Sequence, residues 1–296
     1  MQKEFISQRL EIGDLTLSES NFILELTNSA DWIKFIGDRN LHSAEDAEKY
    51  IQKLIDNPDV HYRVVKLKDE QISIGVITMI KRDYLPHHDI GFAFLPQFGK
   101  QGYAREASEV VLDSLACTGS PILAITMAEN TSSIQLLEKL GFGFDKEVEA
   151  GGEVLLQYSI SPDTMQISQL TKRFFGLFTN SNGEVPNWER IYQLCIPEAI
   201  IIKKAGAQQE VYNLESFIEP RKAILSDGTL TDFEEYETAH TTVVTGNIAQ
   251  RHSKFSKTGF LKGQHFKQAG HKLFQYIKTE DGWRICSVVW EDGPVA

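Results

Sequence analysis

The sequence predicts two domains of different fold class, an α/β domain followed by an α+β domain. In the first half, apolar strand segments alternate with segments of helical periodicity, which is typical of a sheet layered with helices. In the second half the predicted helices come first and long strand segments follow, which indicates an antiparallel sheet packed against helices. A chain of 296 residues has room for both domains.

The predicted boundary lies near Ser161-Pro162-Asp163. Proline disfavours helix at the residue before it, and the charge balance changes at this point. Residues 1–160 contain 15 Lys and Arg against 25 Asp and Glu, a net charge of −10, whereas residues 161–296 contain 15 against 16, a net charge of −1. We therefore predict one domain over residues 1–160 and a second over residues 164–296.

The elements of the first domain follow from local patterns. We predict helices over residues 20–28, 43–54, 106–116 and 132–140, and strands over residues 62–67, 72–80, 89–95, 122–127 and 154–160. Ser43 is a favourable N-cap, Asp46 stands three residues after it, and apolar residues then recur at helical spacing. Gly141 is expected to end the last helix, because glycine readily adopts the left-handed conformation found there.

The second domain is predicted to contain helices over residues 164–178, 188–195 and 214–223, and strands over residues 199–204, 232–244, 248–257, 270–278 and 282–291. In the strand over residues 232–244, four polar side chains stand at even spacing, so one face of the strand can carry them all. We expect this face to point outward to solvent; the alternative is that it lines a pocket in which one of them acts as a base. The residues at that spacing are Asp232, Glu234, Tyr236 and His240. Trp283 and Trp290 are expected in the core or lining a pocket.

Composition limits the function classes. A hydrophobic content of 42% and a charged content of 24% are typical of soluble globular proteins. No apolar run is long enough for a membrane span, and the first residues lack the apolar core of a signal peptide. Cys117, Cys195 and Cys286 are far apart, so we expect thiols in a reducing cytoplasm, with no metal site and no disulfide framework. The acidic first half argues against a nucleic-acid partner, because the phosphate backbone is itself negatively charged. The acidity suits a positively charged binding partner such as an amine, or it serves only to keep the protein soluble.

Residues 96–107, Pro-Gln-Phe-Gly-Lys-Gln-Gly-Tyr-Ala-Arg-Glu-Ala, form the most informative segment of the chain. They read as a glycine-containing turn that opens a helix, and the apolar strand over residues 89–95 leads into it. The N-terminus of a helix exposes unpaired N–H groups and a partial positive charge, which suits a pyrophosphate.

This turn is followed in order by Asn130-Thr131-Ser132-Ser133 and by Leu140-Gly141-Phe142. Two segments near the start belong to the same ordered set: residues 8–12, which look like an opening strand, and residues 35–40, which look like an acceptor-side segment. The ordered set resembles the GNAT acetyltransferases, specifically the RimJ-like branch, over residues 5–160. The resemblance implies the acyl-CoA N-acyltransferase fold. It also implies acetyl transfer from acetyl-CoA to an amine, carried by a small molecule, an antibiotic or a protein N-terminus.

The same resemblance implies the site. The amides of residues 100–104 are implied to hold the pyrophosphate, and the backbone of residues 93–95 to pair with the pantetheine. The implied cofactor-binding residues are Ala93, Phe94, Leu95, Lys100, Gln101, Gly102, Tyr103, Ala104, Asn130 and Ser133. For Asn130 and Ser133 a helix cap is a second role, compatible with the first.

Asp89 is the candidate general base, because relatives often place a carboxylate at the start of the strand beside the thioester. The alternative is a solvated residue where the strand begins. The neighbouring His87 and His88 have near-neutral intrinsic pKa values, but we expect them to be loop histidines. Asp38 and Arg39 either face the acceptor or form a structural ion pair.

Two positions depart from the family pattern. Lys100 stands where the phosphate turn usually has its first glycine, with Gly99 displaced by one residue. Lysine there either adds a charge-assisted contact to phosphate or obstructs the approach of the backbone. Leu137 stands where many relatives carry the tyrosine that protonates the leaving thiolate.

The second half resembles the NTF2-like cone of the SnoaL and ketosteroid-isomerase proteins, over about residues 164–293. The likeness rests on residues 174–178, Trp188 and Trp283-Arg284-Ile285. That superfold hosts enzymes, binding modules and dimerisation units. Three functions therefore stay open. The first is an acetyltransferase with a cone for ligand binding or homodimerisation, the second a bifunctional enzyme with a proton-transfer site in the cone, and the third an acetyl-CoA-binding sensor without turnover.

Overall fold

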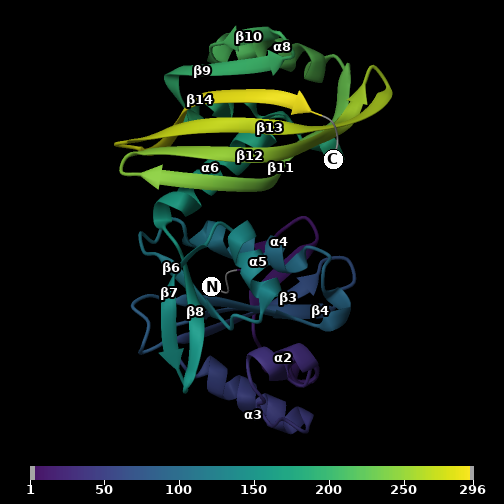
Figure 1. Ribbon diagram of the computed structural model, residues 1–296. Helices are drawn as coiled ribbons and strands as arrows, with labels where there is room; N and C mark the ends of the chain where they lie inside the picture. The colour runs from purple at the N-terminus through teal and green to yellow at the C-terminus, as the bar shows by residue number, and fades with distance from the viewer. Residues whose placement is uncertain (1–3, 294–296) are drawn as a thin grey trace. The chain divides into compact units, whose positions relative to one another are not determined.

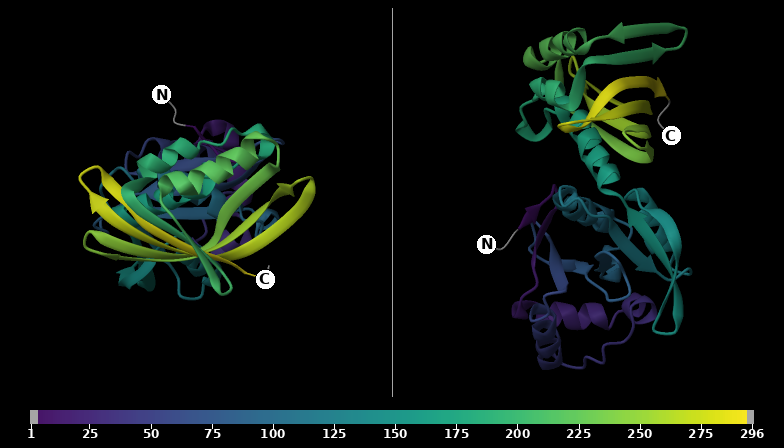
Figure 2. Two further views of the ribbon diagram at one scale, coloured as in Figure 1. Left: turned by 90° about the horizontal axis from the view of Figure 1, so that it is seen from above. Right: turned by 90° about the vertical axis from the view of Figure 1, so that its left-hand side faces the viewer.

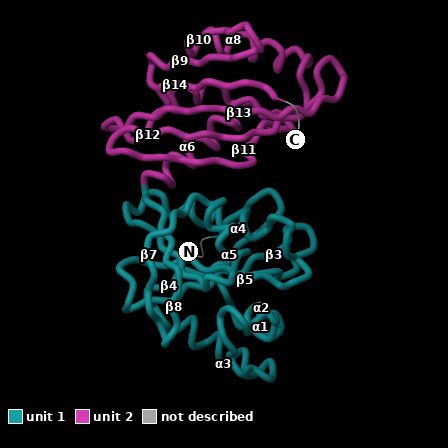
Figure 3. The backbone as a smooth tube through the Cα atoms, in the orientation of Figure 1, with its two compact units in different colours: residues 1–162 teal, residues 163–296 magenta. Residues whose placement is uncertain are grey.

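The computed structural model describes residues 4–293. The chain divides into two compact units, residues 1–162 and 163–296, which Figure 3 shows in different colours. The division falls at the proline where the charge balance changes. Pro162 is the first residue of helix α6 (Pro162–Phe175), a position that tolerates proline because the N–H it lacks would have no partner there.

The first unit is built on one mixed sheet, with strand order β1-β2-β3-β4-β5-β6-β8-β7 in the described residues. Neighbouring strands are antiparallel except β5 and β6, which are parallel. The strands are β1 (Phe5–Ile6), β2 (Leu10–Asp14), β3 (Val60–Leu67), β4 (Ser73–Ile80), β5 (Asp89–Phe94), β6 (Ile122–Thr126), β7 (Gly143–Ala150) and β8 (Glu153–Ile160).

Helices cover both faces of this sheet (Figure 1). Helices α1 (Ser20–Thr27), α2 (Ala30–Phe35) and α3 (Ala44–Ile55) pack on one face, and α4 (Tyr103–Leu115) and α5 (Thr131–Lys139) on the other. Ile23, Ile51 and Val76 belong to the buried cluster between the sheet and the first three helices. The N-cap predicted for α3 is present, since the Asp46 amide donates to Ser43 Oγ at 3.1 Å.

The predicted glycine stop of α5 is also present. Gly141 has a φ of +91°. Its amide donates to the Glu138 carbonyl, and the Phe142 amide donates to the Leu137 carbonyl, each at 3.0 Å. This is the double closure of a Schellman motif, and the buried side chains of Leu137 and Phe142 accompany it. The Leu-Gly-Phe segment is thus accounted for by the end of the helix.

Three elements of the first unit were not predicted, and one of them, β1, has only two residues. Helix α2 has six residues, too few to show a helical period. Strand β7 lies at the edge of the sheet and is mostly exposed, and its charged sequence Asp145-Lys146-Glu147 reads as a polar loop. Edge strands often carry such charges, because they discourage pairing with other chains.

The second unit is a curved sheet whose concave side holds the helices (Figure 2). Its strand order in the described chain is β10-β9-β14-β13-β12-β11, and only the pairing of β14 with β9 is parallel. The strands are β9 (Cys195–Ala205), β10 (Gln208–Tyr212), β11 (Leu230–Thr245), β12 (Ile248–Leu261), β13 (Gln264–Thr279) and β14 (Gly282–Gly293). Helices α6, α7 (Ile191–Leu194) and α8 (Leu214–Ser226) accompany them, and Phe174, Phe217 and Phe274 join the core.

The helix predicted over residues 188–195 is shorter than expected. A 3₁₀ turn, Trp188–Arg190, leads into the four-residue α7, and Cys195 already begins β9. Pro197 follows two residues later and cannot continue a helix. It lies where the pairing of β9 with β14 is interrupted, between Cys195 and Ile200, so no ladder hydrogen bond is lost.

Strand β11 does not carry one continuous polar face. A bulge lies between Glu237 and Ala239, so the side chains change face there. Glu234 and Tyr236 therefore point to the opposite side from His240, and the prediction that all of them share a face was wrong. Glu235 and Glu237 take the inner positions of the strand, and both pair with buried cations.

Glu106 ties helix α4 to the start of the first unit. Its Oε1 accepts from Ser7 Oγ at 2.7 Å and from the Arg9 amide at 2.9 Å, and its Oε2 accepts from Arg9 Nε at 2.7 Å. Burial alone would raise the pKa of Glu106, but the hydrogen bonds from Ser7 and Arg9 outweigh it and hold that pKa below its usual value. The charged carboxylate is therefore stabilised by folding.

The first prediction concerns this carboxylate. We expect Glu106→Gln to lower the free energy of unfolding by about 1–2 kcal/mol at neutral pH, since charge-assisted hydrogen bonds are lost at a partly exposed site. A depressed pKa contributes stability above the unfolded value, about 4.3, and that contribution disappears as the pH falls through the folded pKa. Urea unfolding at neutral and acidic pH measures both. Glu109→Gln, in the half-buried pair of Glu109 with Arg105 within α4, is the control, and an equal effect of both changes would contradict the assignment.

The second prediction concerns the two units. Expressed separately, residues 1–162 and residues 163–296 are each expected to unfold cooperatively, because each has its own buried cluster. Thermal unfolding followed by circular dichroism tests this. Failure of both fragments to fold would show that the division does not separate independent domains.

Candidate active site

The parallel strands β5 and β6 part soon after they meet. In the described residues they share one register pair, Asp89 with Leu123, supported by a 2.9 Å hydrogen bond from the Leu123 amide to the His88 carbonyl. Strand β5 continues to Phe94 with β4 on one side and no ladder on the other. The backbone of β5 thus borders an open seam, and this is a place where an extended ligand can add to the sheet as a strand.

The alternation of β5 decides which groups face the seam. The Leu95 amide donates to the Ile74 carbonyl of the β4 side at 2.9 Å. Residues two apart in a strand share a direction, so Ala93 also faces β4, and Phe94 and Phe92 face the seam. Of the segment 93–95, Phe94 is therefore the residue that presents backbone groups to a ligand in the seam. The Leu95 N–H is already engaged.

Gly75 fixes the position of Phe94. Gly75 lies opposite Phe94 in the β4–β5 ladder, and a Cβ on Gly75 would stand 2.4 Å from the Phe94 ring. The ring thus lies directly on the glycine, and any larger residue would displace it. This contact holds the exposed edge of β5 in place beside the seam.

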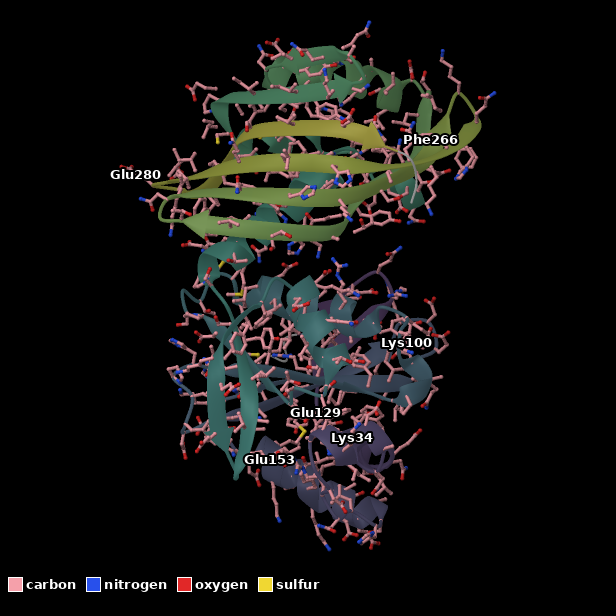
Figure 4. The ribbon with its side chains drawn as sticks, viewed as in Figure 1. Lys34, Lys100, Glu129, Glu153, Phe266 and Glu280 are labelled. Carbon is pink, nitrogen blue, oxygen red and sulfur yellow. The ribbon has the colours of Figure 1, made fainter. Side chains whose placement is uncertain are left out.

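The turn that follows β5 has the backbone shape of a glycine-rich loop. Lys100, labelled in Figure 4, has a φ of +59°, and Gly102 has a φ of +84° as the N-cap of α4. Lys100 therefore occupies the left-handed conformation that a glycine would adopt freely. The first N–H groups of the 13-residue α4, at Tyr103 and Ala104, have no partner within the helix.

Arg9 supports this turn from the bend just before β2. Its Nη1 donates to the Gln101 carbonyl at 3.1 Å, and its guanidinium lies 4.4 Å from the centre of the Tyr103 ring. No local pattern predicts this contact, because 92 residues separate Arg9 from Gln101. The arginine brings positive charge to the turn, although Glu106 balances it.

Asn130 and Ser133 form a helix cap. The Ser133 amide donates to Asn130 Oδ1 at 3.1 Å at the start of α5. Further along α5, Leu137 is almost completely buried, with 1% of its surface exposed. An aliphatic side chain in the core supplies no proton, so this position offers no acid for a leaving group.

Asp89 is buried, with 2% of its surface exposed, and it accepts from Arg82 Nε at 2.8 Å. The alternative of a solvated residue at the start of the strand was therefore wrong. Burial raises the pKa of Asp89 above its usual value, and the charge and hydrogen bond of Arg82 partly offset that effect. Arg82 was missed because it lies in the loop that joins β4 to β5, for which no structure was predicted.

Aromatic hydroxyls gather beside this ion pair. Burial raises the pKa of Tyr62 on β3, with further contributions from a hydrogen bond to Tyr50 of α3 and opposing ones from the charges of Arg39 and Arg82. The Asp38 side chain stabilises its own loop, because its Oδ1 accepts a hydrogen bond from the Asn40 amide at 2.7 Å.

His87 and His88 lie in the loop before β5, and the His88 side chain is exposed. In residues 4–293 no group of three or more His, Cys, Asp or Glu is arranged to hold a metal ion. Within the same range no helix is both long and apolar enough to cross a membrane.

Comparison with known proteins concerns the first unit. The family model described as "Acetyltransferase (GNAT) domain" matches residues 9–143. The uncharacterized N-acetyltransferase YnaD of Bacillus subtilis (strain 168) is 28% identical over 148 residues, which are 48% of this chain and 85% of that protein.

Two solved structures extend the comparison. A GCN5-related N-acetyltransferase from Brucella melitensis is 15% identical with a TM-score of 0.50, over 58% of this chain and 85% of that chain. A spermidine N-acetyltransferase from Vibrio cholerae, solved in complex with CoA and spermine, is 18% identical with a TM-score of 0.47, over 54% of this chain and 99% of that chain. The N-terminal half of the chain, over residues 9–143, is thus a GNAT acetyltransferase domain with the acyl-CoA N-acyltransferase fold.

Proposed function

We propose that this chain is an acetyl-CoA-dependent N-acetyltransferase that transfers an acetyl group to a primary amine. One observation carries the proposal: the seam beside β5 leads into a turn that opens the N-terminus of α4. A seam with unpaired strand groups suits the amides of pantetheine, and the N-terminus of a helix suits its pyrophosphate. The two follow one another along the chain, from residues 92–94 to residues 100–104.

The residues of this path have separate roles in the proposal. Phe94 pairs with the pantetheine through its backbone, and the amides of residues 100–104 bind the pyrophosphate, with Lys100 adding charge. Asn130 keeps its side-chain N–H groups for a contact with the cofactor, because its Oδ1 is used in the cap. Ala93 and Leu95 shape the strand from the β4 side.

The proposed reaction joins the amine nitrogen to the acetyl carbon and breaks the bond from that carbon to sulfur. Asp89, ionised in its pair with Arg82, accepts the proton that the attacking amine loses, directly or through a water molecule. The thiolate takes its proton from solvent, since Leu137 offers none. Acetyl-CoA and an amine thereby give an N-acetyl amine and CoA.

The finer parts of the proposal rest on sequence likeness. The RimJ-like branch accounts for the absence of an acid at Leu137, and a cytoplasmic location suits an acetyl-CoA-dependent reaction. We infer an NTF2-like cone for the second unit, from its helices on the concave side of a curved sheet. Its role is ligand binding or homodimerisation.

A sensor that binds acetyl-CoA without turnover is the competing function. It is favoured by the buried Leu137 and by the lysine in the phosphate turn. A panel of polyamines, aminoglycosides and peptides with free N-termini, with released CoA measured by a thiol reagent, separates the two. Release of CoA that depends on one amine supports the transferase, and tight binding without release on any amine supports the sensor.

The third prediction tests the phosphate turn. Lys100→Glu is expected to weaken acetyl-CoA binding by at least about tenfold, because it places an anion beside the pyrophosphate. Lys100→Gly retains the left-handed backbone and is expected to raise the melting temperature while changing the affinity less. Lys53→Glu, an exposed lysine in the last turn of α3, makes the same change of net charge and is the control. Equal calorimetric affinities for Lys100→Glu and Lys53→Glu would place the pyrophosphate elsewhere.

The fourth prediction tests Asp89. Asp89→Asn is expected to lower turnover by on the order of 10²–10⁴ and to leave acetyl-CoA affinity nearly unchanged. A base with a raised pKa loses activity as it is protonated, so the acid limb of the wild-type profile should lie above the usual value for Asp, about 3.9. The defect should shrink at high pH, where the amine deprotonates unaided.

The matched control is Asp14→Asn, another carboxylate paired with an arginine at 2.9 Å, on β2. A turnover defect in Asp89→Asn that stays constant from about pH 6 to about pH 9 indicates that the ion pair with Arg82 is only structural. Wild-type turnover in that variant excludes Asp89 as the base.

A further inference from the structure

The second unit contains a cavity of about 550 Å³, partly open to solvent, between its helices and the concave face of its sheet. This volume falls in the range of small-molecule sites. Phe174, Phe217, Phe233, Phe266 and Trp290 supply aromatic walls, and Phe266 lies near the start of β13 (Figure 4). Apolar walls of this kind suit the aromatic or alkyl body of an organic molecule.

The polar groups of the cavity carry an excess of positive charge. Four cations and two carboxylates line it: Lys203, Arg221, Lys257, Lys272, Glu235 and Asp292. Both carboxylates form ion pairs with lysines of the cavity. Lys272 Nζ lies 2.5 Å from Glu235 Oε2, and Lys257 Nζ lies 2.6 Å from Asp292 Oδ1.

Lys272 is committed to its pair. It is 5% exposed, and three phenyl rings surround its ammonium group, with the ring centres of Phe175 and Phe255 at 4.6 and 4.7 Å. Burial lowers the pKa of Lys272, and the charge of Glu235 opposes that effect. The pair therefore forms a fixed polar part of the wall, and breaking it would leave one buried charge alone.

Arg221 is different, because the ion pairs of residues 4–293 do not include it. Its guanidinium stacks 3.7 Å from the centre of the Phe217 ring, and its Nη1 donates to the Phe217 carbonyl at 2.6 Å. Burial lowers the pKa of Arg221 to about 10, while the charges of Glu235 and Glu210 act against that change. It therefore remains charged at neutral pH.

A charged guanidinium in an apolar cavity is costly without an anion. Its remaining N–H groups form a planar fork that matches a carboxylate. Four aromatic rings lie 3.7–6.0 Å from the guanidinium, those of Phe217, Tyr212, Trp290 and Phe178, and together with one carbonyl they compensate only part of that cost. Lys203 is a second cation without a pair in the described chain, but Glu210 lies opposite it in the β9–β10 ladder. Arg221 is thus the group that most needs a negatively charged ligand.

We propose that this cavity binds an amphipathic organic carboxylate with a single negative charge, whose carboxylate pairs with Arg221 and whose aromatic or alkyl body lies against the aromatic walls of the cavity. A single charge matches the cavity because its other cations are paired or faced by a carboxylate. The site is independent of the proposed acetyl transfer, since every residue involved belongs to the second unit.

The test uses three probes of one shape and different charge: naphthalene-1-acetate, its neutral amide, and 1-naphthylmethylamine. Calorimetric titration of the intact chain should show the acetate binding at least about tenfold more tightly than the amide, the effect of one charge-assisted pair. The amine should bind most weakly. Equal affinities of acetate and amide, tighter binding of the amine, or no binding of any probe at millimolar concentration would each overturn the proposal.

Two neighbouring variants locate the site. Arg221→Gln should remove most of the preference for the acetate and leave the amide affinity unchanged, which also reports that the cavity is intact. Lys222→Gln, at the exposed position next to it on α8, loses the same charge and should behave like the unmodified chain. A preference for the acetate that survives in Arg221→Gln belongs to another part of the chain and rejects this site.

Discussion

The arrangement of the first unit depends on one constraint, the separation of two parallel strands that have only just met. A sheet gains stability from paired N–H and C=O groups, so strands that part leave such groups facing outward. Here the separation follows the single pair of Asp89 with Leu123. The next elements make use of it, because β5 runs directly into the left-handed turn at Lys100 and Gly102 that opens α4. A ligand with amides at one end and phosphates at the other satisfies both features at once.

The second unit depends on a different constraint, which is the neutralisation of charged side chains in its interior. Its long curved strands create an interior large enough to hold charged side chains, and most of these are neutralised in pairs. The Glu237 carboxylate, for example, accepts from Arg251 and Ser253, which holds its pKa below the usual value although burial acts in the opposite direction. Against this background Arg221 stands out, because it lines the cavity without a carboxylate partner in the described residues, and a perturbed group in a cleft is a candidate for a binding site.

Much of the fold could be predicted from the sequence, because the local capping and turn signals and the spacing of apolar residues agree with the observed helices and strands. The cap of Ser43, the glycine stop at Gly141 and the strand–turn–helix of residues 89–107 all follow from nearest neighbours in the chain. The candidate site was harder to predict, because its most important contacts join segments that are far apart in the sequence. The bonds of Arg9 to Gln101 and Glu106 span more than ninety residues, and no local pattern encodes them. The bulge in β11 had the same effect in the second unit, where one inserted residue puts His240 on the opposite face from Glu234 and Tyr236.

The two departures from the family pattern have unequal physical weight. Lys100 keeps the left-handed backbone that a glycine would adopt, at a cost of roughly 1–2 kcal/mol, so the shape of the turn is preserved and a positive charge is added. Leu137 is different, because its place in the core and in the closure of α5 leaves no room for a polar group to act there. In the proposed reaction, the thiolate therefore takes its proton from solvent. The same proposal places the titratable groups on the acceptor side, in the buried pair of Asp89 with Arg82.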